Sequence, residues 1–183
     1  MTEEQFYQTF WHWSPEKNWP PNSTTHIKDI KPSDKLNLTI TQTSFPASLQ
    51  KELVSVWCEK LPQLQEVKYL WFTSRVNQEM FDAACEMQSL EGLYIKWSVI
   101  KDIGKIANLK NIKRLHIGSS TKIEDVNPLA DLVNLQVLEL INLQRIQDYS
   151  VIGNLTELRE LAITGDVWAP KHLKLNLYDR LEL

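Results

Sequence analysis

The sequence from residue 109 to 163 decides the fold, because it holds three copies of one pattern: LKNIKRLHI at 109–117, LVNLQVLEL at 132–140 and LTELRELAI at 155–163. Each copy has a large aliphatic residue at its first, fourth, seventh and ninth positions. The copies begin 23 residues apart (132 − 109 and 155 − 132). Self-similarity at a period of this length is typical of stacked supersecondary units. The sequence therefore predicts a repeat architecture.

The end of each copy alternates like a β-strand. Leu115 and Ile117 point to one side of such a strand, whereas Arg114, His116 and Gly118 point to the other. One face therefore belongs to the core, and the other face can meet solvent or a partner.

Between the strands, apolar residues recur at every third position, as at Ile123, Val126 and Leu129. This spacing favours a 3₁₀ or short helical return over a second strand. A single unit cannot bury its apolar side alone, so neighbouring units must stack. We expect an α/β solenoid with a curved parallel sheet on its concave side and the returns on its convex side.

The pattern resembles that of the leucine-rich-repeat proteins, specifically the short-repeat kind seen in internalins and in a phosphatase-1 regulatory subunit. The same frame fits further sets on both sides of the opening stretch, namely Leu64, Val67, Leu70 and Phe72; Met87, Leu90, Leu93 and Ile95; and Leu175, Tyr178, Leu181 and Leu183. The resemblance covers residues 64–183. It implies a non-catalytic protein-recognition module that acts as an adaptor, a regulator or a neutralising partner.

Members of that family often carry an asparagine just after the strand, whose side chain ties adjacent loops together. This chain departs from that pattern, since the residues at the corresponding offset are Arg75, Ser98, Ser120, Leu143 and Asp166. A regular asparagine ladder is therefore not expected, although Asn142 lies one place away and can serve locally.

The regions before the repeats predict a cap and two helices. Residues 1–34 do not repeat and are rich in aromatic residues, which either form a partner site or cap the first unit of a solenoid at 35–183, in a single compact domain. Leu36, Leu38 and Ile40 alternate like a first strand. Helices are expected over 46–61 and 77–87, and the later returns should be shorter and 3₁₀-like.

Composition excludes several function classes. The net charge of −3 and the pI of about 5.8 give no basic surface for nucleic acid. We expect no secretory signal in the acidic start and no membrane span. Cys58 and Cys85 are expected to stay reduced rather than pair. These features predict a cytoplasmic monomer.

The sequence offers little catalytic chemistry. The four histidines are scattered without metal-site spacing, and no phosphate-binding glycine loop occurs. No cofactor or metal is expected. The protein is predicted not to be an enzyme, and the alternative is a hydrolase in the N-terminal segment.

The concave strand positions form the candidate site. Trp71, Tyr94 and His116 occupy the same position on successive strands and should form a row of rings. The predicted partner-binding residues are Tyr69, Trp71, Tyr94, Lys96, Trp97, Arg114, His116 and Glu139. Tyrosine, tryptophan and arginine are enriched at protein interfaces. Two other interpretations stay open: binding of a small ligand or carbohydrate to the tryptophan and tyrosine row, and simple packing of the rings across strands.

The C-terminal end departs from the period at Trp168 and Pro170. A repeat array needs a terminal cap, because a bare strand edge exposes unpaired backbone groups. We expect the segment 166–174 to close the core locally. The alternative is that a strand ending at Leu183 pairs with a second copy of the chain.

Overall fold

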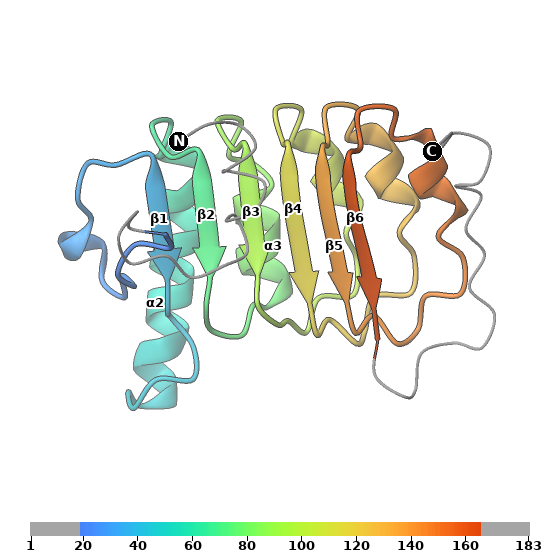
Figure 1. Cartoon of the computed structure of the whole chain (residues 1–183). Coiled ribbons are helices and arrows are strands. Elements are labelled where there is room, and N and C mark those ends of the chain that lie inside the picture. Colours follow the sequence, from blue (N-terminus) through green and yellow to red (C-terminus); the bar gives the residue numbers. More distant parts are fainter. Residues whose placement is uncertain (1–18, 166–183) are drawn as a thin grey trace.

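The computed structural model describes residues 19–165, which contain a six-stranded parallel sheet whose strands follow the chain order. The strands are β1 (Lys35–Leu38), β2 (Tyr69–Phe72), β3 (Gly92–Ile95), β4 (Arg114–Gly118), β5 (Val137–Ile141) and β6 (Glu160–Thr164). Within the described residues the sheet is open, and the helices and 3₁₀ turns that connect its strands lie behind it in one layer (Figure 1). The predicted solenoid with a parallel sheet is confirmed.

The returns on the convex side change along the chain as expected. The first two contain the helices α2 (Ala47–Lys60) and α3 (Gln78–Ala84), with η3 (Leu61–Gln63) after α2. The next three are the 3₁₀ turns η4 (Gly104–Asn108), η5 (Asn127–Asp131) and η6 (Ser150–Asn154). An apolar residue at every third position suits three residues per turn. Before β1 lies one more 3₁₀ turn, η2 (Ile27–Asp29).

An aspartate opens each 3₁₀ return at the same place in the repeat. The side-chain oxygen of Asp102 accepts the N–H of Gly104 at 2.7 Å. Asp125 and Asp148 do the same for the residues two places further on, both at 2.8 Å. Each carboxylate therefore satisfies a backbone donor that the short turn leaves without a partner.

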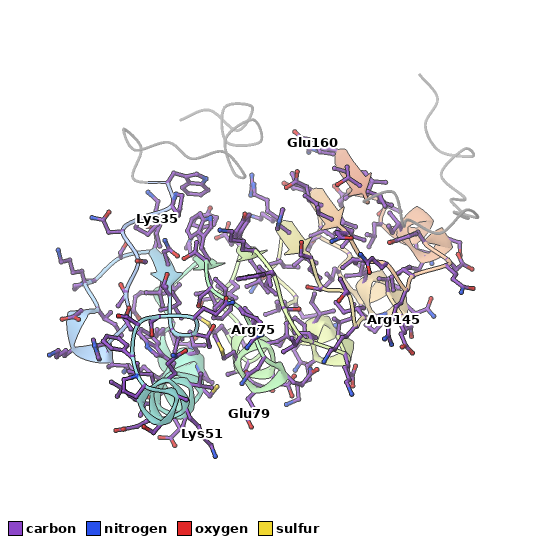
Figure 2. The ribbon with its side chains drawn as sticks, turned by 90° about the horizontal axis from the view of Figure 1, so that it is seen from below. Lys35, Lys51, Arg75, Glu79, Arg145 and Glu160 are labelled. Carbon is purple, nitrogen blue, oxygen red and sulfur yellow. The ribbon has the colours of Figure 1, made fainter. Side chains whose placement is uncertain are left out.

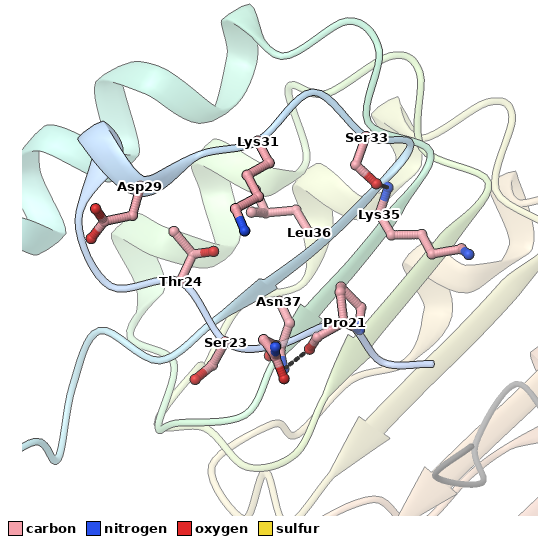
Figure 3. Close-up of a pocket in the computed structure, with 10 residues that line it drawn as sticks. Pro21, Ser23, Thr24, Asp29, Lys31, Ser33, Lys35, Leu36 and Asn37 are labelled. Carbon is pink, nitrogen blue, oxygen red and sulfur yellow. Dashed lines mark hydrogen bonds between the residues drawn. The ribbon is translucent and has the colours of Figure 1, made fainter. Parts of the chain in front are cut away.

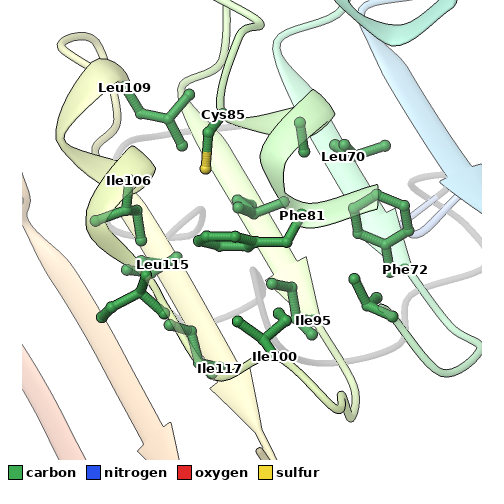
Figure 4. Packing of buried hydrophobic residues seen from close by; sticks show 14 of the residues in the cluster. Leu70, Phe72, Phe81, Cys85, Ile95, Ile100, Ile106, Leu109, Leu115 and Ile117 are labelled. Atoms are coloured by element: carbon green, nitrogen blue, oxygen red, sulfur yellow. The ribbon is translucent and has the colours of Figure 1, made fainter. Parts of the chain in front are cut away.

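The inward strand positions form one continuous core. Leu70, Phe72, Leu93, Ile95, Leu115, Ile117, Leu138 and Leu140 are all buried, and Figure 4 shows the helix residue Phe81 packed among several of them. The shared repeat frame predicts the same burial for Leu161 and Ile163, but these two residues are only partly buried. Within residues 19–165, their strand β6 has a paired neighbour on one side only.

Serines replace the asparagine ladder after the strands. Ser74, Ser98 and Ser120 are buried, and the hydroxyls of Ser98 and Ser120 are 2.6 Å apart. The hydroxyl of Ser74 accepts the N–H of Ile40 at 3.0 Å, so it ties the turn after β2 to the turn after β1. Ser98 and Ser120 thus link neighbouring turns at the offset where the family pattern has an amide, and Ser74 does so one place before it.

A second ladder joins the repeats just before each strand. The carbonyl of the residue that precedes one strand accepts two N–H groups of the next repeat, at 2.8 to 3.1 Å. The accepting residues are Asp34, Lys68, Glu91, Lys113 and Gln136. This paired bond fixes the relative register of neighbouring strands.

Residues 19–34 pack against the first strand. Thr24 forms an isolated parallel bridge with Leu38, and the indole N–H of Trp57 in α2 donates to the carbonyl of Thr25 at 2.7 Å. The expectations about residues 1–18, about the segment 166–174 with Trp168 and about Leu183 lie outside the described residues. No helix within residues 19–165 combines the length and the apolar character that a membrane crossing requires.

Candidate functional site

The concave side of the sheet carries the predicted row of residues. Figure 2 shows Lys35 and Glu160 on the face of the sheet opposite the helices, which carry Lys51 and Glu79. On this face, the register pairs Trp71 with Tyr94, Tyr94 with His116 and His116 with Glu139. The alternation of the strands therefore places the row as the sequence predicts.

Trp71 is covered rather than open. The ring of Trp19 meets that of Trp71 edge-on, with the ring centroids 4.8 Å apart. The ring centroid of Tyr69 lies 5.3 Å from that of Trp19. Trp71 is only 2 % exposed, and the ammonium of Lys35 lies 5.5 Å from the centroid of the Trp19 ring. Trp71 is therefore packed, because a residue outside the repeat frame covers it, and its role in partner binding stays a prediction. Trp71 does not offer a flat stacking surface to a sugar.

Tyr94, His116 and Glu139 form a connected group across β3, β4 and β5. The rings of Tyr94 and His116 stack with centroids 4.2 Å apart and planes 20° from parallel. Nδ1 of His116 lies 2.8 Å from Oε2 of Glu139, so the two side chains are hydrogen-bonded. Burial, with Glu139 nearby, raises the pKa of Tyr94. The phenol therefore stays neutral and can donate a hydrogen bond.

Gly118 lets the strands approach beside this group. A Cβ atom at this position would lie 2.5 Å from the Lys96 carbonyl oxygen and 2.9 Å from Nε2 of His116. Both contacts are too short for any side chain to fit without a shift. The glycine is therefore needed for the position of the His116 ring.

Lys96 and Trp97 follow β3 and lie at the end of the concave face. Both are exposed, and Trp97 has an exposed fraction of 39 %. Their backbone is nevertheless held, because the N–H of Val76 donates to the Trp97 carbonyl at 3.1 Å. This pair combines a large ring and a positive charge on a fixed backbone.

A charged row at the opposite ends of the strands was missed by the sequence reasoning. The ammonium groups of Lys68 and Lys113 each lie 3.0 Å from a different carboxylate oxygen of Glu91. Burial raises the pKa of Glu91, but the hydrogen bonds from the two lysines outweigh it and hold this pKa below its usual value. The signal in the sequence is the shared repeat position of these residues, just before each strand.

Arg114 lies on the concave side near Tyr69. It is buried, with an exposed fraction of 5 %. Burial raises the pKa of Tyr69, with Glu91 acting in the same direction and the charge of Arg114 opposing them. Arg114 thus belongs to the interior of the concave layer, whereas Lys96 and Trp97 belong to its margin.

The described residues contain little that could act as a nucleophile or hold a metal. Among residues 19–165, no three or more histidine, cysteine, aspartate or glutamate side chains gather as metal ligands would. Burial, with nearby carboxylates, raises the pKa of Cys58 to about 11 and also raises that of Cys85. Both thiols therefore stay protonated at neutral pH and react slowly.

No protein-family model matches the chain, and no curated protein matches it. Among solved structures, it is similar to internalin C2 of Listeria monocytogenes, with 26 % identity over 64 % of this chain and a TM-score of 0.48. A second internalin of that organism has 18 % identity over 67 % of this chain and a TM-score of 0.41. A leucine-rich-repeat protein of Leptospira interrogans has 16 % identity over 78 % of this chain and a TM-score of 0.49.

The match spans 48 %, 47 % and 36 % of those three chains, so this chain corresponds to half of each or less. The fold itself is identified by the molecule's own geometry. The 23-residue frame, the open parallel sheet and the 3₁₀ returns are the features of one architecture. This chain has the leucine-rich-repeat fold.

Proposed function

We propose that this protein is a non-catalytic recognition module that binds a partner protein through its concave sheet and the adjoining margin. A role in protein interaction agrees in general terms with a leucine-rich-repeat solenoid. The observation that carries the proposal is the exposed pair Lys96 and Trp97, which adjoins the group of Tyr94, His116 and Glu139.

The chemistry of this surface suits a protein partner. Tryptophan and tyrosine supply a large contact area for few rotatable bonds, and they are enriched among residues that dominate binding energy. The stack of Tyr94 on His116, together with the bond to Glu139, holds three side chains in place before binding. Less conformational entropy is then lost when a complex forms.

We also propose that the protein works as a monomer in the cytoplasm. The support for this compartment is that Cys58 and Cys85 are free thiols, since unpaired cysteines are usual where the environment is reducing. A solution mass that stays constant on dilution would agree with the monomer.

The test is a quantitative capture experiment with cell extract from the source organism. Immobilised wild-type protein is compared with the double variant Lys96→Ala and Trp97→Ala. Val133→Ala serves as a matched control, because Val133 is also an exposed apolar residue, at 59 %, but lies in the turn before β5.

We expect the double variant to retain about tenfold less of the specific partner than the wild type does, because the loss of a dominant contact weakens binding by at least this factor. Its thermal unfolding should match that of the wild type, because both side chains are exposed. Equal retention by the double variant and the Val133 control would rule out this surface.

A further inference from the structure

The outer edge of β1 presents backbone groups away from the sheet. In a strand, the N–H and C=O groups of successive residues alternate in direction. The carbonyl of Leu38 faces β2, where it accepts the N–H of Thr73 at 3.0 Å. The backbone groups of Lys35, Asn37 and Thr39 therefore face outward.

Most of these outward groups have partners within the described chain. The N–H of Lys35 donates to the Ser33 hydroxyl at 3.1 Å. The carbonyl of Asn37 and the N–H of Thr39 both bond to the backbone of Thr24, at 2.7 and 3.2 Å. Within residues 19–165, the Lys35 carbonyl and the Asn37 N–H have neither a backbone nor a side-chain hydrogen-bond partner.

These two groups are spaced for one extended residue opposite Leu36. In a parallel pair, a residue donates to the carbonyl before its partner and accepts from the N–H after it. Thr24 does this opposite Leu38. Asn22 would continue the pattern opposite Leu36, but the chain turns away there, and the Pro21 carbonyl instead accepts the side-chain amide of Asn37 at 2.9 Å.

A pocket of about 350 Å³ opens where the chain turns away. Figure 3 shows its walls, with Pro21 to Thr24 on one side and β1 on the other, and with the Lys31 side chain reaching into the space between Thr24 and Leu36. Its lining residues are Pro21, Asn22, Ser23, Thr24, Asp29, Lys31, Ser33, Lys35, Leu36 and Asn37. The pocket thus combines an incomplete strand edge with two lysines, Lys31 and Lys35, and one aspartate, Asp29.

We propose that this pocket binds the carboxy-terminal residue of an extended peptide by strand addition. The peptide N–H donates to the Lys35 carbonyl, and the terminal carboxylate accepts from the Asn37 N–H and from the Lys31 ammonium. A guest strand parallel to β1 must end at this point, because Thr24 already occupies the next paired position. This site lies at the β1 edge of the sheet and includes none of the residues Tyr94, Lys96, Trp97, His116 and Glu139 of the proposed partner surface.

Titration of the ¹⁵N-labelled chain of residues 1–183 tests the proposal. The probes are N-acetyl-Ala-Ala with a free carboxylate, the same peptide as its carboxy-terminal amide, and acetate alone. We expect a saturable shift of the Asn37 amide with the free-carboxylate peptide. The amide form and acetate should each bind at least about three- to fivefold more weakly, because an exposed charge contact contributes modestly.

Variants separate the two halves of the site. Lys31→Gln should weaken binding by about three- to fivefold, whereas Lys28→Gln should not, since Lys28 is exposed nearby but does not line the pocket. Ser23→Phe should block binding by filling the space.

Other outcomes would overturn the proposal. These are the absence of a saturable shift at Asn37, an equal response of the two lysine variants, or shifts that concentrate on Tyr94 and His116. Acetate binding as tightly as the peptide would mean an anion site without strand addition. A shift of the Asn37 amide that depends on protein concentration without peptide would identify a second copy as the occupant.

Discussion

Single residues decide how the concave group is built. The repeat frame could predict that His116 and Glu139 are neighbours, because they share one strand position on consecutive repeats. It could not predict that Trp19 covers Trp71, since Trp19 lies outside the repeat and its contact depends on how the chain enters the sheet. The close approach at Gly118 was equally hidden, because glycine carries no periodic signal.

Substitution of Gly118 tests the close approach of the strands directly. We expect Gly118→Ala to lower the free energy of unfolding by about 1–3 kcal/mol, because the new methyl group overlaps backbone as well as the His116 ring. Gly104→Ala is the matched control: its Cβ would meet only the Asp102 side chain, at 3.1 Å, which has to shift by no more than a few tenths of an ångström. Denaturant unfolding compares the two. Equal losses would show that the strand contact is not tight.

At the scale of elements, the sequence was most informative where apolar spacing changed. A stripe over 46–61 predicted α2, and steps of three residues predicted η4 to η6, since the period of burial differs between the two kinds of helix. The polar links between elements were less visible. Ion pairs join the starts of three strands through Lys68, Glu91 and Lys113. In the sequence, these charged residues do not differ from those of an ordinary solvated surface.

This charged row should make stability depend on pH. The pKa of Glu91 is lowered in the folded protein, so its contribution is complete above the unfolded value of about 4.5 and is lost as the pH falls through the folded pKa. Wild-type protein should therefore lose more stability between about pH 5 and pH 3 than Glu91→Gln does. Urea unfolding at several pH values measures this difference. Parallel curves for the two proteins would contradict the ion-pair assignment.

The whole molecule depends on contacts between neighbours. Each repeat buries its apolar side only against the next, so the inward-facing residues form one continuous cluster. Trp19 and Trp71 form a second, smaller cluster on the concave side. The 23-residue period could predict this continuous core, because no single unit can bury its apolar side alone. The period could not predict the structure at the edge of β1, where residues 19–34 lie outside the repeat and line a pocket.

A cavity in the middle of the stack should be costly. Leu138 in β5 is fully buried, so Leu138→Ala should lower the free energy of unfolding by about 2–5 kcal/mol, since neighbouring repeats on both sides can only partly collapse around the gap. Leu161→Ala should cost less, because Leu161 is only partly buried. Thermal unfolding ranks the two variants. A larger loss for Leu161 would mean that the stack is tightest at β6 rather than at β5.

The paired bonds before each strand also limit where the chain can change in length. The carbonyls of Asp34, Lys68, Glu91 and Lys113 must each meet the next repeat at the same point. The step between them nevertheless varies from 34 residues (68 − 34) to 22 (113 − 91). The difference is absorbed entirely on the side of the returns. We therefore expect the protein to tolerate insertions and deletions in the returns behind the sheet, whereas a change of length at a strand entry would shift the register of neighbouring strands.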